Sequence, residues 1–164
     1  MTEDGNTNSF GSVEWRREAF TMAFYVAVVL IAALVAFDNQ PRLPALGLVW
    51  GTTVGLALAH LFAFDLATRL VRGRLHSDHD RSLASAQLTG ATVIAMITSL
   101  PVLFFTDESV VDAMRFVLSA VIALAAFAVG KSSGAGTIRS SIFALLVLLV
   151  ATAVALVKNL LLGH

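Results

Sequence analysis

Long apolar runs, separated by short polar stretches, occupy almost the whole chain. A helix needs about 20 mainly apolar residues to cross a hydrocarbon core roughly 30 Å thick. Five runs meet this requirement, and they predict helices at about 19–37, 45–68, 87–105, 111–130 and 141–162. The pattern is typical of an all-α, polytopic membrane protein, in which residues 13–164 form a single bundle of five transmembrane helices.

The first twelve residues break this pattern. They are rich in Thr, Asn, Gly and acidic residues, and they cannot bury enough apolar surface to offset their chain entropy. We expect 1–12 to form a disordered tail. The apolar run that follows Arg16 and Arg17 is longer than the roughly 7 to 15 apolar residues of a signal peptide. We therefore expect it to be retained as a helix.

Composition narrows the class further. Hydrophobic residues make up 57% of the chain and charged residues 13%, whereas a soluble domain has about 25% charged residues. The absence of cysteine excludes disulfides, thiolate metal sites and cysteine nucleophiles. The chain also has no P-loop, zinc-protease, serine-hydrolase or dinucleotide-binding motif. We expect a protein that is not an enzyme, carries no cofactor and binds no nucleic acid.

The basic residues predict how the chain crosses the membrane. Lysine and arginine near membrane ends favour the cytoplasmic side. With five crossings, one side carries Arg16, Arg17, Arg69, Arg72, Arg74, Arg81, Lys131 and Arg139, whereas the other carries only Arg42 and Lys158, near the acidic Asp107 and Glu108. We predict a multi-pass protein of the cell membrane with its N-terminus in the cytoplasm and its C-terminus outside.

The longest internal connection, 69–86, contains four arginines. Juxtamembrane arginines attract anionic lipid by about 1 kcal/mol each, so we expect this loop to bind anionic headgroups of the bilayer. The alternative is a metal site, because imidazole and carboxylate groups suit zinc and similar ions. Its ligands would be His76, Asp78, His79 and Asp80. Their spacing is a weak signal, and we expect no metal.

A row of small residues marks one face of the second predicted helix. Gly47, Gly51 and Gly55 recur every four residues, and Ala59, Ala63 and Ala67 continue the row. Residues four apart share a helix face, and small residues allow membrane helices to approach closely. We expect this row to pack against another helix, either in the same chain or in a second subunit.

Pro101 lies within the third predicted helix. Proline removes a backbone donor and tends to kink a helix. The hydroxyls of Thr98 and Ser99 are placed to satisfy the freed carbonyl groups. We therefore expect a bend near the outer end of this helix.

Polar and ionisable side chains inside the bilayer are costly and usually face the interior of the bundle. A helical rise of about 1.5 Å per residue places polar groups of the first three helices at one depth, with two carboxylates nearer the cytoplasm. This predicted polar layer consists of Glu18, Tyr25, His60, Asp65 and Thr92.

Two interpretations of the layer remain open. In the structural one, His60 is neutral and bonds to the hydroxyl of Tyr25 or Thr92, for about 1 kcal/mol per hydrogen bond. In the functional one, an imidazole that changes charge near neutral pH lies above carboxylates on a path for protons or cations. Other charges are expected to pair within their helices, Asp65 with Arg69 and Asp112 with Arg115.

Together these features favour a small channel or transport protein for a proton or small cation. The short loops and the glycine row suggest that it works as an oligomer. The alternative is a structural or accessory subunit of a larger membrane complex, which would use the same row to dock on a partner.

Overall fold

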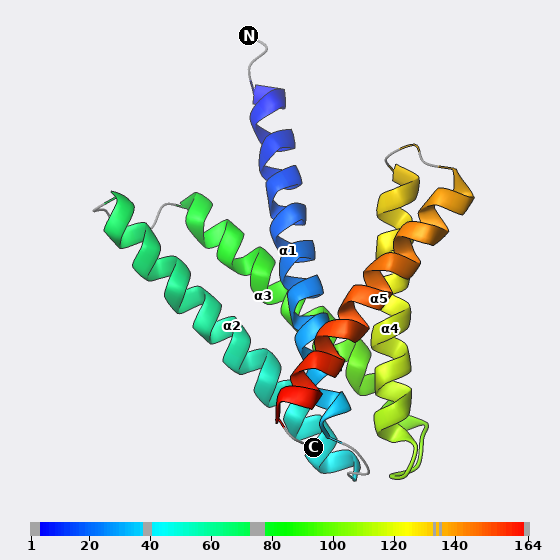
Figure 1. The fold of residues 1–164 in the computed structure, drawn as a ribbon. Coiled ribbons are helices and arrows are strands. Elements are labelled where there is room, and N and C mark those ends of the chain that lie inside the picture. The colour runs from blue at the N-terminus through cyan, green and yellow to red at the C-terminus, as the bar shows by residue number, and fades with distance from the viewer. Residues whose placement is uncertain (1–3, 38–40, 73–77, 133, 135, 163–164) are drawn as a thin grey trace.

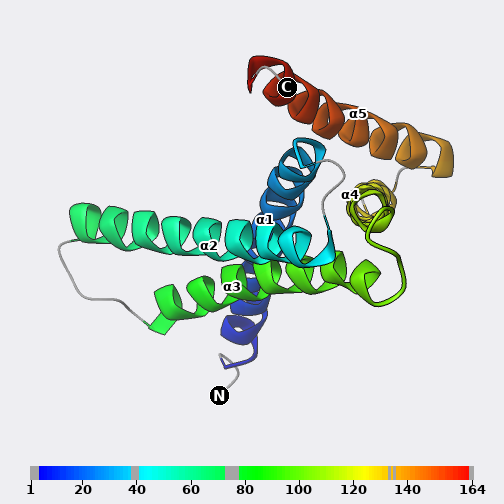
Figure 2. The same cartoon turned by 90° about the horizontal axis from the view of Figure 1, so that it is seen from below.

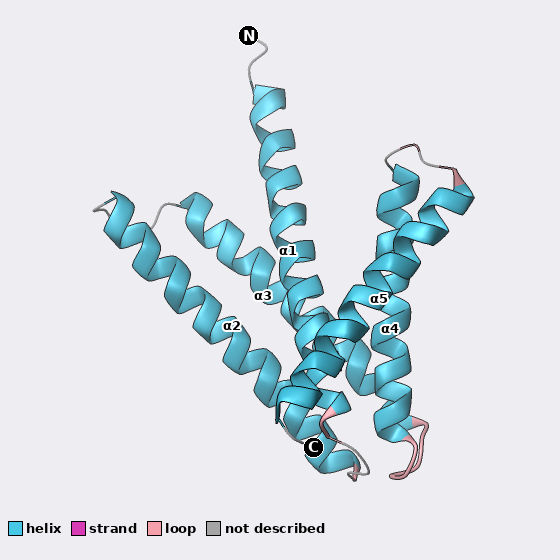
Figure 3. Ribbon diagram, viewed as in Figure 1, coloured by secondary structure: helices cyan, strands magenta, loops and turns pink. Residues whose placement is uncertain are grey.

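The computed structural model describes residues 4–37, 41–72, 78–132, 134 and 136–162. The described residues form five long helices and no strand (Figure 1, Figure 3). The helices are α1 (Asp4–Val35), α2 (Arg42–Arg72), α3 (Asp78–Ser99), α4 (Val110–Ser132) and α5 (Thr137–Leu162), with a short 3-10 helix, η1 (Leu100–Leu103), after α3.

Four of these helices are long and apolar enough to cross a membrane. The spanning stretches are Gly11–Val35, Arg42–Ala67, Asp80–Leu103 and Val110–Ser132. The chain is thus a multi-pass membrane protein by the length and composition of its helices. Within the part of α5 whose side chains the structure describes, the apolar stretch Thr137–Val150 is shorter than a membrane span. A fifth crossing therefore stays a prediction, and so does the orientation of the termini.

Helix α1 is longer than the sequence pattern indicates. It begins at Asp4, inside the segment 1–12 for which we expected a disordered tail. Residues 1–3 lie outside the described part of the chain. The apolar run predicts the portion within the bilayer, whereas the helix continues beyond it because each further residue adds one backbone hydrogen bond to an existing helix.

The helices form two groups that meet at α1. Helix α2 lies antiparallel beside α3, and α4 is paired with α5 (Figure 1). Helix α1 packs along α3 and also contacts α4 and α5, as the view from below shows (Figure 2). The largest fully buried side chains lie where α1 meets α4, and they include Val26, Leu30, Leu34, Met114, Leu118 and Ile122.

A close helix crossing occurs at a glycine that the sequence analysis did not select. A Cβ atom added to Gly90 of α3 would overlap the carbonyl oxygen of Ala19 in α1. A second close contact joins α4 to α5, where a Cβ on Gly130 would lie 2.8 Å from Oγ of Ser140. Small residues let membrane helices approach in this way, and here they hold α1 on α3 and α4 on α5.

Helix α3 ends just before Pro101. The α-helix stops at Ser99 and the chain continues as η1, with Pro101 buried in its first turn. The hydroxyl of Thr98 donates to the carbonyl of Ile94, and that of Ser99 donates to Ala95, each at 2.7 Å. The α-helix is therefore interrupted near Pro101, and the expected bend at this point stays a prediction. Proline lacks the N–H that an α-helix needs, but its fixed φ suits the start of a 3-10 turn.

Charged side chains separate to the two ends of the bundle. Residues Arg16, Arg17, Arg69, Arg81, Lys131 and Arg139 belong to the end where α1 and α3 begin and α2 and α4 finish (Figure 1). At the opposite end, Arg42 pairs with Asp107 at 2.7 Å. The expected pairs also form, Asp65 with Arg69 at 3.0 Å and Asp112 with Arg115 at 2.8 Å. We call the first end the basic end.

Candidate functional site

A pocket of about 240 Å³ lies near the basic end, on the side of α1 that faces α2 and α3. We call it the Glu18 pocket. Its lining residues are Glu18, Thr21, Met22 and Tyr25 of α1, His60 of α2 and Gln87 of α3. It is the place where polar side chains from the first three helices meet.

Helical spacing explains the contribution of α1. Positions 18, 21, 22 and 25 are three or four residues apart, so they share one face of the helix. The neighbouring positions 19, 20 and 23 point to another face, where they contact α3 or open toward the membrane. One helix thus presents a polar face on one side and an apolar face on the other.

Gln87 is the most deeply buried polar residue in the pocket, with 4% of its surface exposed. Its Nε2 donates a hydrogen bond of 3.1 Å to Oε2 of Glu18. Its Oε1 is buried and accepts no hydrogen bond from any residue that the structure describes. Buried amide oxygens nearly always have a partner. Within the described residues this oxygen is thus an acceptor without a donor, and it is enclosed by the protein.

The carboxylate of Glu18 lies beside this acceptor. One quarter of its side chain is exposed, and Oε1 lies 3.6 Å from Nη2 of the more exposed Arg17. The six lining residues include no lysine or arginine. Carboxylate, amide and hydroxyl oxygens are the ligands that hard cations prefer, so the pocket's chemistry suits a proton or a small cation.

The structure brings three of the five predicted polar-layer residues together, namely Glu18, Tyr25 and His60. Asp65 does not line the pocket and instead pairs with Arg69. Thr92 is exposed and is also absent from the lining. Thr92 follows Gln87 by five residues, which places it about 140° round the helix at 3.6 residues per turn. Helix face therefore decided which of these residues line the pocket.

Thr21 and Gln87 are the pocket residues that sequence reasoning missed. Thr21 follows Glu18 by three residues, so the shared face was available as a signal. Its hydroxyl donates to the carbonyl of Arg17 at 2.8 Å. Gln87 had no such signal, because only the packing of α3 on α1 brings its amide to the carboxylate.

Two more buried hydroxyls lie between the Glu18 pocket and the opposite end of the bundle. Thr53 precedes His60 by seven residues, two turns along the same face of α2, and Thr98 follows Gln87 by eleven, three turns along α3. Their exposed fractions are 3% and 0%. Their hydroxyls donate to the carbonyls of Val49 and Ile94 in their own helices. Polar atoms therefore extend beyond the pocket along both helices.

The glycine row of α2 faces outward. A Cβ atom added to Gly47, Gly51 or Gly55 would meet nothing within 4 Å, and Ala59 is exposed. Within the described part of the chain, no other helix packs on these glycines. Of the two expected partners, only a helix outside this chain remains available for the row.

The charged loop after α2 lies largely outside the described residues. The structure omits 73–77, including Arg74 and His76, and describes no side chains for Asp78 and His79. Asp80 is buried at the start of α3. Within the described part of the chain, no group of three His, Cys, Asp or Glu side chains is placed to hold a metal ion. The metal alternative and the expected binding of anionic lipid by the loop stay predictions.

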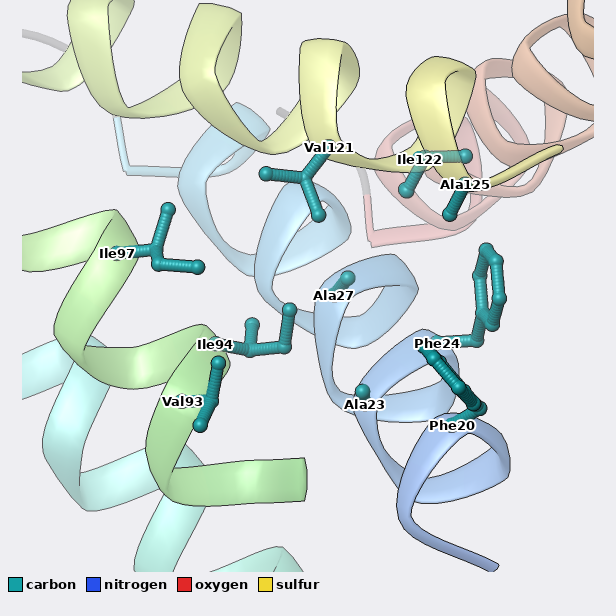
Figure 4. A pocket seen from close by; sticks show the side chains of 10 residues that line it. All are labelled: Phe20, Ala23, Phe24, Ala27, Val93, Ile94, Ile97, Val121, Ile122 and Ala125. Carbon is teal, nitrogen blue, oxygen red and sulfur yellow. The ribbon is translucent and has the colours of Figure 1, made fainter. Parts of the chain in front are cut away.

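On the other side of α1, two hollows open between the helices. One, about 170 Å³, has a wholly apolar lining from α1, α3 and α4, including Phe20, Phe24, Val93, Ile97 and Val121 (Figure 4). The other, about 360 Å³, lies toward the basic end and is lined in part by Trp15, Arg16 and Gly90. Phe20, Ala23 and Val93 line both hollows, which therefore adjoin.

Comparison with known proteins gives no relative: no family model, no curated protein and no solved structure matches this chain.

Proposed function

We propose that this protein transports a proton or a small cation across the membrane, and that the Glu18 pocket holds the cation on its way. The observation that carries the proposal is the partly exposed Glu18 carboxylate, which lines the pocket and accepts a hydrogen bond from Nε2 of Gln87. A carboxylate within a membrane-spanning stretch is costly unless it is paired or protonated. A bound cation or proton would neutralise it.

The position of the pocket supports this proposal. Ionisable groups within membrane helices are costly and commonly mark ion or proton pathways. Glu18 lies within a stretch of α1 that is long and apolar enough to span the membrane. The cost of placing its carboxylate there is offset by the Gln87 amide and by a cation in the pocket.

Beyond Glu18, imidazole and hydroxyl groups offer the next steps. Tyr25 and His60 line the same pocket, and imidazole exchanges protons near neutral pH. Thr53 and Thr98 then provide buried hydroxyls toward the opposite end. In this mechanism the cation enters from the basic end, is held by Glu18 and Gln87, and passes along the faces of α2 and α3.

A second candidate function rests on the open glycine row. Because Gly47, Gly51 and Gly55 contact nothing within the described chain, they form a smooth face for a second helix. In the transport proposal that helix belongs to another copy of the same chain. In the alternative, the protein is an accessory subunit and the helix belongs to a partner membrane protein.

The test is cation flux in vesicles. The purified chain is reconstituted with a pH-sensitive dye inside, and flux is driven by a membrane potential. We expect the native chain to conduct, and Glu18→Gln to abolish flux. The matched control is Glu108→Gln, the same change at an exposed position near the opposite end, which should leave flux unchanged.

A further variant separates transport from structural support. Gln87→Met removes the buried amide and keeps a side chain of similar length. The change also removes the Nε2 donor to Glu18, so a loss of up to about 1–3 kcal/mol in stability is expected. Transport should fall by more than the unfolded fraction, which thermal unfolding in detergent measures in the same sample. Absence of flux from the native chain would contradict the proposal, and so would equal flux from the native chain and Glu18→Gln. Recovery of the inert chain with a stoichiometric partner would favour the accessory subunit.

A further inference from the structure

The groove on the outer side of α1 offers a second binding site, unrelated to the Glu18 pocket. It consists of the two adjoining hollows that share Phe20, Ala23 and Val93. We call it the α1 groove. It begins beside Arg16 and Trp15 at the basic end. Its apolar part, between α3 and α4, extends to Ala27 (Figure 4).

The two ends of the α1 groove differ in chemistry. Arg16 is exposed at the basic end and Trp15 is half-buried beside it. Arginine attracts anionic lipid headgroups, and tryptophan favours the level of the headgroups. Deeper in the membrane the lining is wholly apolar, with Ile97 and Val121 on the walls. The α1 groove therefore has a basic end and an apolar interior, which complement a molecule with an anionic head and a hydrocarbon tail.

The length of the groove matches one lipid leaflet. Twelve residues separate Trp15 from Ala27, which is about 18 Å along a helix. Half of the hydrocarbon core is about 15 Å. Gly90, where α3 lies directly on α1, and Phe20 both line the part of the groove near the basic end.

From these observations we infer that the α1 groove binds one anionic phospholipid, with its phosphate at Arg16 and one acyl chain between α1, α3 and α4. This is a specific lipid site, in contrast to the general attraction expected of a basic loop. It would join the two helix groups, because the chain contacts α3 on one wall and α4 on the other.

The test uses Trp15 as a reporter. The chain has two tryptophans, so Trp50→Phe leaves Trp15 as the only one. This variant is reconstituted in vesicles of phosphatidylcholine and phosphatidylglycerol at a fixed ratio, with brominated acyl chains on one lipid or the other. Bromine quenches tryptophan on contact. We expect stronger quenching when the bromine is on phosphatidylglycerol, and its reversal by added unbrominated phosphatidylglycerol.

Four variants in the same background locate the lipid. Arg16→Gln should remove the preference for phosphatidylglycerol, whereas Arg139→Gln, the same charge change at another exposed basic residue of that end, should keep it. Val93→Phe fills the groove and should weaken quenching by the anionic lipid. Val54→Phe, on an exposed site of α2, should not. The competition step needs no groove variant and therefore does not depend on how those variants fold.

Three results would overturn the inference. Equal quenching by the two brominated lipids would mean that Trp15 meets only bulk lipid. Absence of quenching by either would mean that protein covers the groove. A preference for phosphatidylglycerol that survives both Arg16→Gln and Val93→Phe would place the lipid elsewhere on the molecule.

Discussion

At the residue scale, buried or half-buried polar side chains join elements that lie far apart in the sequence. Arg115 of α4 donates from Nε and Nη2 to the carbonyl of Leu34, at 3.1 and 2.6 Å, while Nη1 donates to Asp112. Leu34 lies in the last turn of α1, and its carbonyl also accepts a hydrogen bond of 3.1 Å from the backbone N–H of Phe37. Arg115 therefore fixes the end of α1 on α4, a role beyond the local ion pair that its spacing predicts.

We expect Arg115→Gln to lower the free energy of unfolding by about 1–3 kcal/mol, as for hydrogen bonds to charged groups. The control is Arg42→Gln, which breaks a more exposed pair with Asp107 and should cost less than about 1 kcal/mol. Equilibrium unfolding in mixed detergent micelles measures both. Equal losses would contradict a special role for Arg115.

At the element scale, the sites of closest helix approach are single small residues and not the regular glycine row. Gly90 lies directly against the backbone of α1, whereas Gly51 has open space around it. Both are helical glycines near the middle of their helices. The sequence alone therefore does not tell which glycine packs against another helix. The structure shows that Gly90 does and that, within the described chain, Gly51 does not.

Gly90→Ala should destabilise the fold, because its Cβ would overlap the carbonyl oxygen of Ala19 and α3 would have to move away from α1. Overpacking of this kind costs about 1–3 kcal/mol and occasionally more. Gly51→Ala should be neutral or slightly stabilising in a monomer, since alanine favours helix by up to about 1 kcal/mol. Thermal unfolding in detergent compares them. An unchanged thermal stability of Gly90→Ala would contradict the close α1–α3 crossing.

At the scale of the whole molecule, α1 separates two kinds of surface. The Glu18 pocket lies on the side of α2 and α3, and the apolar groove lies on the side that also meets α4. A third surface, the glycine row of α2, faces away from the described chain. Basic residues gather at one end of the bundle (Figure 1). The molecule therefore presents three distinct surfaces: a pocket with a carboxylate, an apolar groove and an exposed glycine row.

If a second helix packs on the glycine row, Gly51→Leu should lower the oligomeric mass of the purified protein while its helix content and thermal stability as a monomer stay unchanged. The reason is that leucine keeps helix backbones apart and meets no part of its own chain at this position. Light scattering in mild detergent gives the mass. The matched control is Val129→Leu, at an exposed site of α4 away from the row. An unchanged mass for Gly51→Leu would exclude this row as the interface.

The sequence by itself determined the helical class, the membrane-spanning stretches of four helices and the local ion pairs, such as Asp65 with Arg69. These features depend on residues within a few turns of one another, through apolar length and helical spacing. It also selected Glu18, Tyr25 and His60, three residues that line one pocket, from their predicted depth. Depth follows from the helical rise alone, so it can be counted along the chain.

Only the tertiary structure decided which faces meet. It brought Gln87 to Glu18 and left Thr92 outside the pocket. It placed Gly90, not Gly51, at a close crossing, and it ended α3 at Ser99 before Pro101. The rotation of a helix about its axis is set by how side chains of different helices fit together. That information is spread over residues distant in the sequence, and a pattern within one helix does not contain it.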